Sequence, residues 1–229
     1  TLGASLGTNT VTAAAAGLTG SPVSFNATAT AGAPTTIAAN SVTTQSAIAG
    51  TAVAAPPSVL VTDAGNNPVA GVSVTFAVTA GGGAISPASP ATVSTNASGI
   101  ATLTSWTVGA TVGANSVTAS VAGLAGSPVT FDATGTVGPA AALAISSQPA
   151  GAVTGVAFTT QPVVQIRDAN GNLTASTATV TVALASGGGT LGGTTTVTAV
   201  NGVATFTDLL ITGVGAHTLT FTSTGVSSV

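Results

Sequence analysis

The sequence predicts an all-β protein built from tandem sandwich domains, and three observations lead to this prediction. Apolar residues alternate with Thr, Ser or Gln along several segments, which is the period of a strand with one buried face. Val and Thr dominate these segments, and their branched Cβ atoms suit a pleated surface. The stretch SVTASVAGLAGSPVTFDATGT from Ser116 has a near copy, TVTAAAAGLTGSPVSFNATAT, from Thr10. Such self-similarity is typical of an array of repeated units.

Four segments carry the strand pattern most clearly: SVLVTD from Ser58, VSVTFAVTA from Val72, VVQIRD from Val163 and ATVTVALAS from Ala178. Turn signals lie between them: DAGNNP at Asp63, GGG at Gly81, NASG at Asn96, DANGN at Asp168 and NG at Asn201. These residues tolerate positive φ or hydrogen-bond to their own backbone. The AAAA run from Ala13 has strong helix propensity, but its repeat counterpart contains Val121, so both are predicted to be strand.

The repeat defines the predicted domains. TLGASLGTNTVTA from Thr1 matches TVGATVGANSVTA from Thr107, so the chain is expected to open inside a domain. Residues 1–32 are predicted to be the carboxy-terminal strands of a preceding repeat, 33–137 a complete repeat, and 138–229 a repeat that lacks its last strand. GAPT at Gly32 and GPAA at Gly138 mark junctions so short that neighbouring domains are expected to form a semi-rigid rod.

Composition excludes several classes of function. Only 2% of the 229 residues are charged and the formal net charge is −3. The charged residues are Arg167, Asp63, Asp132, Asp168 and Asp208. Nucleic-acid binding is not expected, because it depends on Lys and Arg that neutralise phosphates. Polar residues interrupt every apolar run well short of about 20 residues, so membrane insertion is not expected either. The absence of Cys excludes disulfides, and the absence of Lys excludes Lys–Asn isopeptide cross-links.

Short strands with turn signals roughly every 8 to 12 residues, in a unit of about 100 residues, point to a Greek-key sandwich. Several stretches resemble one family. They are PSVLVTDAGN at Pro57, its counterpart PVVQIRDANGN at Pro162, the GGG that follows, and the GxAT strands at Gly99 and Gly202. This family is the bacterial immunoglobulin-like repeats of invasin- and intimin-type adhesins and of large repetitive surface proteins. The resemblance implies tandem Greek-key immunoglobulin-like β-sandwiches that form a rod. It also implies an extracellular setting, at the bacterial cell surface or in a secreted fibre.

Few residues are candidates for chemistry. His217 is the sole histidine, but Asn115 and Asn9 take its place in the other repeats, so we expect a polar residue at a strand start and no catalysis. Asp63 and Asp168 are weak calcium candidates, because each loop offers one carboxylate whereas calcium takes about six to eight oxygen ligands. An Asx-stabilised turn explains the same residues and is favoured. No other cofactor is expected.

Other motifs have structural interpretations. Gly81–Gly83 and Gly187–Gly189 lack the continuation of a phosphate-binding loop and are predicted to be bulges or wide connections. Trp106, matched by Leu209 in the next repeat, is predicted to be an apolar plug rather than a sugar-stacking platform, and the six Phe residues are assigned the same role. Glycosylation sequons occur at Asn26, Asn96 and Asn172.

These observations favour a structural function: a stalk, spacer or filament segment on the bacterial exterior, without catalysis. One alternative is an adhesin module that binds a glycan or a host receptor. Another is an accessory module of a secreted polysaccharide-degrading enzyme. The expected partners are neighbouring repeats or identical chains in a fibre, together with a glycan. A strand from residues 1–32 of one molecule could complete the open domain of another; a cut from a longer array would explain the same pattern.

Overall fold

The computed structural model describes residues 6–229, and every regular element in this range is a β-strand. Residues 1–5, with which the predicted segment 1–32 begins, lie outside the described residues. The chain divides into two compact units. The first comprises the residues up to Ala47, Thr51–Gly109 and Gly113–Thr134, and the second comprises Ile48–Gly50, Ala110–Val112 and Gly135–Val229. Among residues 6–229 there is no helix with the length and apolar character needed to span a membrane.

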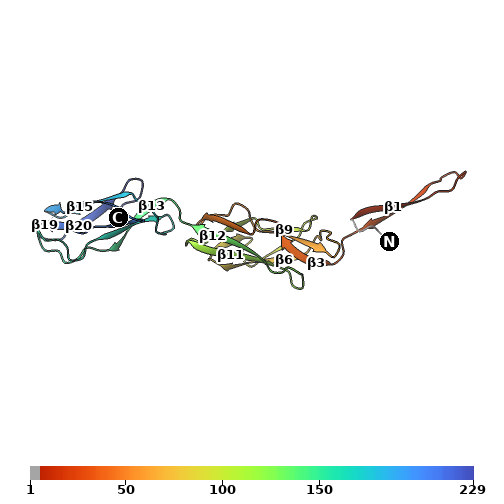
Figure 1. Cartoon of the computed structure of the whole chain (residues 1–229), viewed down its shortest axis with the longest axis horizontal. Coiled ribbons are helices and arrows are strands. Elements are labelled where there is room, and N and C mark those ends of the chain that lie inside the picture. Colours follow the sequence, from red (N-terminus) through yellow and green to blue (C-terminus); the bar gives the residue numbers. More distant parts are fainter. Residues whose placement is uncertain (1–5) are drawn as a thin grey trace. The chain divides into compact units, whose positions relative to one another are not determined.

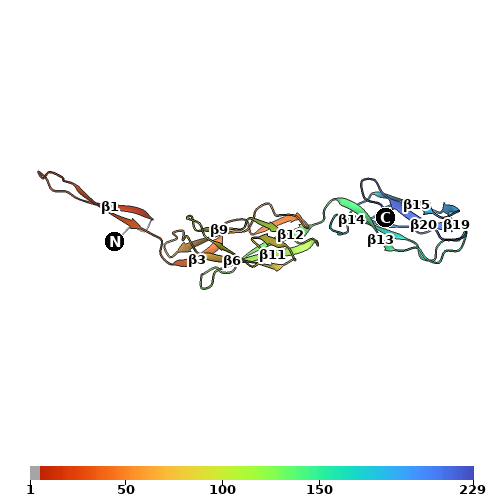
Figure 2. The ribbon, with the colours of Figure 1, turned by 180° about the vertical axis from the view of Figure 1, so that it is seen from behind.

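The strands of the amino-terminal half form four small sheets (Figures 1 and 2). Their bounds are β1 (Gly7–Ala13), β2 (Val23–Ala29), β3 (Pro34–Ala39), β4 (Thr44–Ile48), β5 (Ser58–Asp63), β6 (Ser73–Ala80), β7 (Ala84–Ser86), β8 (Ala91–Ser94), β9 (Ile100–Thr102), β10 (Ser105–Thr107), β11 (Gly113–Ser120) and β12 (Val129–Thr136). The sheet orders are β1-β2, β3-β5-β9, β10-β7 and β4-β12-β11-β6-β8.

The core of the first unit lies between its three-stranded and five-stranded sheets. Alternate residues of β5 and β6 point inward, which places Val59, Val61 and Phe76 in this core at 0% exposure. Trp106 and Phe131 are equally buried. Each fully buried side chain of this size contributes about 1.5–3 kcal/mol through removal of apolar surface from water.

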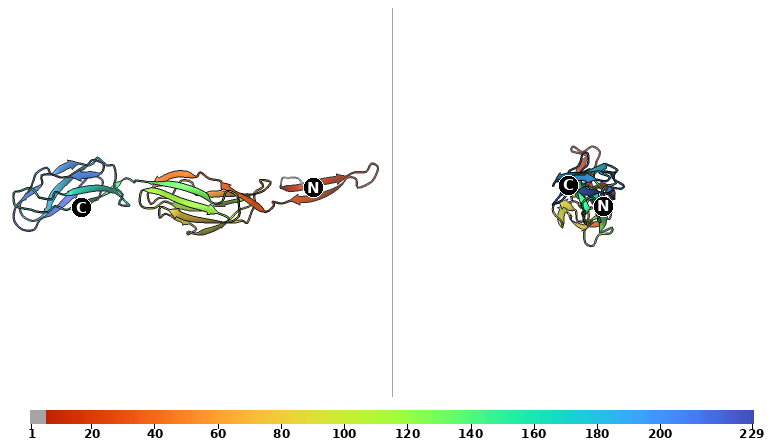
Figure 3. Two further views of the ribbon diagram at one scale, coloured as in Figure 1. Left: turned by 60° about the horizontal axis from the view of Figure 1, so that its bottom comes forward. Right: turned by 90° about the vertical axis from the view of Figure 1, so that its left-hand side faces the viewer.

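The second unit repeats this arrangement with fewer strands (Figure 3). Its strands are β13 (Ala140–Ser147), β14 (Val163–Asp168), β15 (Thr179–Ser186), β16 (Thr190–Gly192), β17 (Thr196–Thr198), β18 (Val203–Thr205), β19 (Leu210–Thr212) and β20 (Thr218–Thr222). They form sheets of order β13-β14-β18, β17-β15-β20 and β16-β19. The rings of Phe206 and Phe221 pack in its core with centroids 5.5 Å apart and an interplanar angle of 57°. Leu209, the counterpart of Trp106, is buried beside them.

The predicted all-β, immunoglobulin-like fold class is therefore confirmed, and the strand positions agree closely. Ser58–Asp63 and Val163–Asp168 are strands with the predicted bounds, and the strands predicted from Val72 and Ala178 begin one residue later. Asn201 has the predicted positive φ, 48°, and forms a tight turn with Gly202. Gly81–Gly83 and Gly187–Gly189 connect β6 to β7 and β15 to β16, as predicted.

The strand prediction for the AAAA run was wrong beyond its first residue. β1 ends at Ala13, and a turn with Gly17 at φ 79° follows. The cause is a side chain: Ser21 Oγ accepts the hydrogen bond of the Ala15 N–H at 2.7 Å, so this N–H does not join the strand ladder. The other copy of the repeat uses the same device, because the Val121 N–H donates to Ser127 Oγ at 3.0 Å.

The core assignment of the Phe residues was wrong for Phe25. The other five are buried, but Phe25 is 59% exposed. β2 pairs only with β1, and no second layer covers this two-stranded sheet. Its repeat counterpart Phe131 is fully buried because β12 lies inside a five-stranded sheet that faces another sheet.

Candidate functional site

The first calcium candidate, Asp63, ends β5 and accepts hydrogen bonds on both carboxylate oxygens. Its Oδ1 accepts from the N–H groups of Gly65 at 2.9 Å and Asn67 at 2.8 Å, which is the predicted Asx-type turn. Its Oδ2 accepts from the N–H of Gly32 at 2.8 Å, two residues before β3 begins. These backbone hydrogen bonds, first that of Gly32 and then that of Asn67, lower the pKa of Asp63.

Asp168 repeats every one of these contacts at the end of β14. Its Oδ1 accepts from Asn170 N–H at 2.9 Å and Asn172 N–H at 2.8 Å, and its Oδ2 accepts from Gly138 N–H at 3.0 Å. Burial acts to raise the pKa of this carboxyl group. The hydrogen bonds from Gly138 and Asn172 outweigh burial and lower the pKa to about 2.

The two carboxylates are therefore used to hold N–H groups. The side-chain Nδ2 of Asn67 lies 3.1 Å from Asp63 Oδ2, and that of Asn172 lies 3.0 Å from Asp168 Oδ2, which adds a fourth donor to each. Four donors directed at one carboxylate suit an anion, whereas a cation needs converging oxygens. Across residues 6–229, no group of three or more His, Cys, Asp or Glu side chains is placed to hold a metal ion.

His217 immediately precedes β20 and is half-buried. Its Nε2 lies 2.6 Å from the carbonyl oxygen of Gly188, so this nitrogen carries the proton and donates. In the first unit the equivalent residue is Asn115, whose Oδ1 accepts from Gly109 N–H at 2.7 Å. His217 thus contacts the glycine-rich connection between β15 and β16, whereas Asn115 contacts the connection between β10 and β11.

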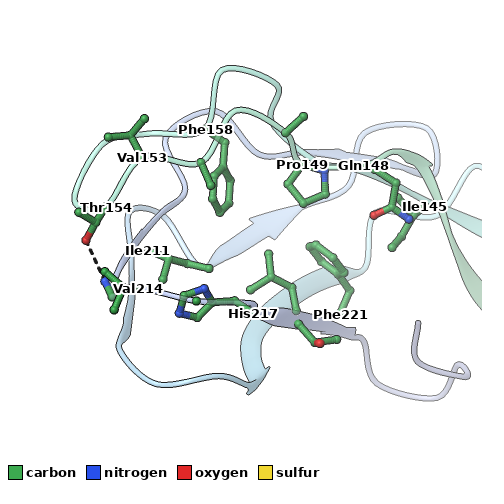
Figure 4. A pocket seen from close by; sticks show the side chains of 16 residues that line it. Ile145, Gln148, Pro149, Val153, Thr154, Phe158, Ile211, Val214, His217 and Phe221 are labelled. Carbon is green, nitrogen blue, oxygen red and sulfur yellow. Dashed lines mark hydrogen bonds between the residues drawn. The ribbon is translucent and has the colours of Figure 1, made fainter.

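A groove of about 730 Å³ lies beside His217 in the second unit (Figure 4). One wall is the edge strand β20 with Leu219 and Phe221, and the opposite wall is the segment from Gln148 to Thr154. Phe158 and Ile211 form the floor. Val153, at 60% exposure, also faces this groove. The groove thus runs along the outer edge of β20, and the polar side chains of Gln148, Thr154, His217 and Thr218 line it together with the apolar ones.

The predicted glycosylation residues differ in accessibility. Asn26 and Asn96 are exposed. Asn172 is half-buried, and its Nδ2 donates to Asp168 Oδ2 and, at 2.9 Å, to the carbonyl of Ala110. Because a glycan is attached through this nitrogen, Asn26 and Asn96 are the better acceptors of the three.

The sheets also carry rows of exposed hydroxyl groups that the sequence reading missed. In the second unit Thr196, Thr181 and Thr222 lie side by side across β17, β15 and β20. The first unit has the equivalent row, Thr92, Thr75 and Ser120 across β8, β6 and β11, in which Ser120 is half-buried. From the sequence the Thr positions drift between faces, and only the pairing register shows that they align.

No protein-family model matches the chain, and no curated protein has a similar sequence. Solved structures do match. FdeC, an adhesin of Escherichia coli, is 15% identical with a TM-score of 0.49, and the match covers 96% of this chain and 70% of FdeC. The D0–D1 domain of intimin is 20% identical with a TM-score of 0.33, over 86% of this chain and 94% of that one. β-Glucuronidase 3 of Bacteroides uniformis is 15% identical with a TM-score of 0.31, over 86% of this chain and 24% of the enzyme.

Adhesins of the invasin and intimin type are thus among the structural matches, as the sequence resemblance predicted. Glycosidases occur among the matches as well. The assignment of tandem sandwiches itself rests on the strand pairing and on the two separate cores.

Proposed function

We propose that the chain is an extracellular structural segment of a bacterial surface protein of the adhesin type. It acts as a spacer that bears tension, without catalysis. One observation supports this most directly: all six ionisable side chains form structural hydrogen bonds within the sandwiches. Asp63, Asp168 and His217 hold turns and strand starts, as described above. Asp132 accepts from Ser116 Oγ at 2.8 Å, across β11 and β12.

The remaining two ionisable residues have similar roles. Asp208 accepts from the N–H of Thr194 at 2.8 Å and from its Oγ1 at 2.9 Å. The guanidinium of Arg167 donates to the carbonyl of Gly171 and to Oε1 of Gln165, within its own hairpin. A catalytic group needs a partner that activates it and space for a substrate, and these six groups are occupied by backbone and neighbouring side chains.

The way the chain enters each sandwich supports a mechanical role. In the first unit β3 pairs in parallel with the segment before β12: Ile37 N–H donates to Ala125 O at 3.0 Å, and Ala125 N–H donates to Thr35 O at 2.9 Å. In the second unit Leu143 N–H donates to Ser227 O at 2.9 Å, and Ser227 N–H donates back to Ala141 O at 2.9 Å. Tension along the chain pulls such parallel neighbours in opposite directions, so it loads these hydrogen bonds in shear.

Single-molecule force spectroscopy tests this proposal. The substitution Ala125→Pro removes the N–H that donates to Thr35, and it should lower the force at which the first unit unfolds. The matched control is Ala122→Pro. Ala122 is the second residue of a β-turn in which Leu124 N–H donates to Val121 O and the third residue, Gly123, has φ 81°. Pro is favoured at the second position of such a turn. Unchanged unfolding force in the Ala125→Pro variant would contradict the mechanical role. Specific binding of the wild-type chain to a glycan array would instead support direct adhesion as its function.

Direct adhesion to a glycan is the second candidate, and the hydroxyl rows are the observation in its favour. They form a similar polar strip in both units, and FdeC and intimin are among the structural matches. Thr75→Val with Thr181→Val should abolish any glycan-array signal, because it removes the central hydroxyl of each row while keeping β propensity. The matched control is Thr79→Val with Ser186→Val, exposed hydroxyl residues on β6 and β15 outside the rows.

A further inference from the structure

The outer face of the sheet β17-β15-β20 carries a regular array of Thr side chains, which we call the threonine net. Its members are Thr179 and Thr181 on β15, Thr196 and Thr198 on β17, and Thr218, Thr220 and Thr222 on β20. Alternate residues of a strand point to the same face, so these hydroxyl groups share the side of the sheet opposite the core. Six of the seven residues are exposed, and Thr220 is half-buried.

The pairing register arranges the threonine net in rows. Thr179 lies opposite Thr198, and Thr181 lies opposite both Thr196 and Thr222. Neighbouring strands are about 4.8 Å apart, and successive outward residues of one strand are about 6.7 Å apart. The hydroxyl groups therefore repeat at set distances in two directions.

Contacts inside the threonine net hold its side chains in place. Thr181 Oγ1 lies 3.4 Å from Thr196 Oγ1, and Thr222 Oγ1 donates to the carbonyl oxygen of Thr181 at 3.4 Å. The branched Cβ of Thr also restricts rotation about χ1. The hydroxyl groups are thus ordered before any ligand arrives, which lowers the entropy cost of binding.

The face lacks the groups that a sugar or an ionic ligand would need. No ionisable residue lies within β15, β17 or β20, and the outward position beside Thr220 is occupied by Ala183. The aromatic residue of these strands, Phe221, is buried on the other side of the sheet. Ligand pockets are concave and lined largely by apolar and aromatic side chains, whereas this face is an open sheet surface. Charged groups bind water strongly in shells of their own, so without them the Thr hydroxyl and methyl groups determine the order of water here.

The first unit has the same array with serine at half of its positions. The equivalent residues are Ser73, Thr75, Thr92, Ser94, Thr118 and Ser120. Serine has no methyl group and its χ1 is less restricted, so its hydroxyl is less fixed in position. The second unit therefore carries the more regular array.

We propose that the threonine net binds ice. Its repeats across and along the strands are close to the repeat distances of water molecules on a prism face of ice. The hydroxyl groups take the places of lattice waters, and the methyl groups lie between them. The net uses a sheet face and no open strand edge. This goes beyond the proposed structural role, and it assigns the hydroxyl row of the second unit to a ligand other than a glycan.

The size of the threonine net determines the kind of activity to expect. The net is three strands wide, and adjacent strands are rotated by about 20–25° relative to each other, so the flat area is small. We therefore expect the full chain to inhibit the recrystallisation of ice and to produce little thermal hysteresis.

A recrystallisation assay of the full chain across concentrations tests the proposal. Thr181→Tyr places a bulky ring at the centre of the net while keeping β propensity. It should raise the concentration needed for half-maximal inhibition about tenfold or more, which corresponds to the loss of one or two net hydrogen bonds. The matched control is Thr205→Tyr, at an exposed Thr of β18 in the other sheet, and it should act as the wild type. No inhibition by the wild type, or equal inhibition by both variants, would overturn the proposal.

A milder variant guards against a folding defect in Thr181→Tyr. The double substitution Thr181→Val with Thr196→Val keeps the shape and the strand propensity of both residues and removes two adjacent hydroxyl groups. Its melting temperature should match that of the wild type while its inhibition of recrystallisation falls. Full inhibition by this folded variant would contradict the role of the hydroxyl groups.

Partition during slow freezing separates ice binding from the other functions. The wild-type chain should be enriched in the growing ice, and Thr181→Tyr should remain in the liquid. If the wild type also remains in the liquid but gives a glycan-array signal that Thr181→Val abolishes, the row binds a glycan and the ice proposal is wrong. The mechanical role is tested separately, by the unfolding force of the first unit.

Discussion

The backbone N–H of Gly138 donates a hydrogen bond to Asp168 Oδ2 at 3.0 Å, and Gly32 makes the same bond to Asp63 at 2.8 Å. In each case the glycine lies just before the first strand of a sandwich, and the carboxylate lies at the end of the strand paired with it. One side chain thus fixes both a turn and the point at which the chain enters the sandwich. Several measurable consequences depend on its charge.

Acid should destabilise the protein through these carboxylates. The folded-state pKa of Asp168 is about 2, below the ordinary value of 3.8, so its contribution is fully present above pH 3.8 and is lost as the pH falls towards 2. The pKa of Asp63 is lowered as well and acts in the same direction. We expect the urea midpoint of unfolding to fall over this range in the wild type. Asp168→Asn should be less stable at pH 7 and less sensitive to acid, whereas Asp132→Asn, with a single hydrogen-bond partner, should behave as the wild type. Equal acid sensitivity of Asp168→Asn and wild type would contradict this.

Calcium should leave stability unchanged. Both oxygens of each Asp63 and Asp168 carboxylate already accept N–H hydrogen bonds, and a bound cation would have to displace these donors. The melting temperature in millimolar calcium should therefore equal that in chelator. A calcium-dependent rise, absent from the Asp63→Asn and Asp168→Asn variants, would instead establish the weak site that the loop sequences allow.

Phe131 and Phe25, which occupy equivalent positions of the repeat, should differ sharply in their contribution to the free energy of unfolding. Phe131→Ala leaves a cavity in the first core and should lower the free energy of unfolding by about 3–5 kcal/mol. Phe25→Ala, the same change in the other copy, should alter it by no more than about 0.5 kcal/mol, because Phe25 is already exposed. Urea titrations followed by circular dichroism at low protein concentration measure both. A large loss of stability in Phe25→Ala would show that β2 is covered in the folded monomer.

Two neighbouring glycines provide a further matched pair. Gly189 has φ 120°, and a Cβ there would lie 2.3 Å from the carbonyl oxygen of Thr212. Gly189→Ala should therefore cost about 2 kcal/mol or more, from backbone strain and displacement of β19. A Cβ on Gly188 meets no atom within 4 Å, so Gly188→Ala should be nearly neutral. Thermal melts of the two variants provide the comparison, and similar melting temperatures would contradict the tight connection seen in the structure.

Much of this fold could be predicted because its determinants are local. Apolar and polar residues alternate in Ser58–Asp63 and Val163–Asp168, and this alternation determines both the strands and their buried faces. The Asx turns form through the N–H groups of the residues two and four positions after each Asp. The position of His217 directly before a strand was also predictable, since Asn115 occupies the equivalent repeat position.

The features that the sequence did not reveal depend on partners far apart along the chain. Phe25 and Phe131 have nearly identical local sequences, and only the presence of a second sheet makes one buried and the other exposed. The hydroxyl rows require the register of three strands, with Thr181 opposite both Thr196 and Thr222. The groove, likewise, is defined by β20 and a segment some 70 positions earlier, and no short motif encodes it.

The fluorescence of Trp106 reports on the first sandwich only. Trp106 is the sole tryptophan, the chain contains no tyrosine, and the indole is buried in the first core with its Nε1 unpaired among apolar neighbours. Its emission should therefore be blue-shifted in the folded state and should report on that core, while the second core is silent. Fluorescence and circular dichroism recorded on one sample would then separate the unfolding of the two sandwiches without any label.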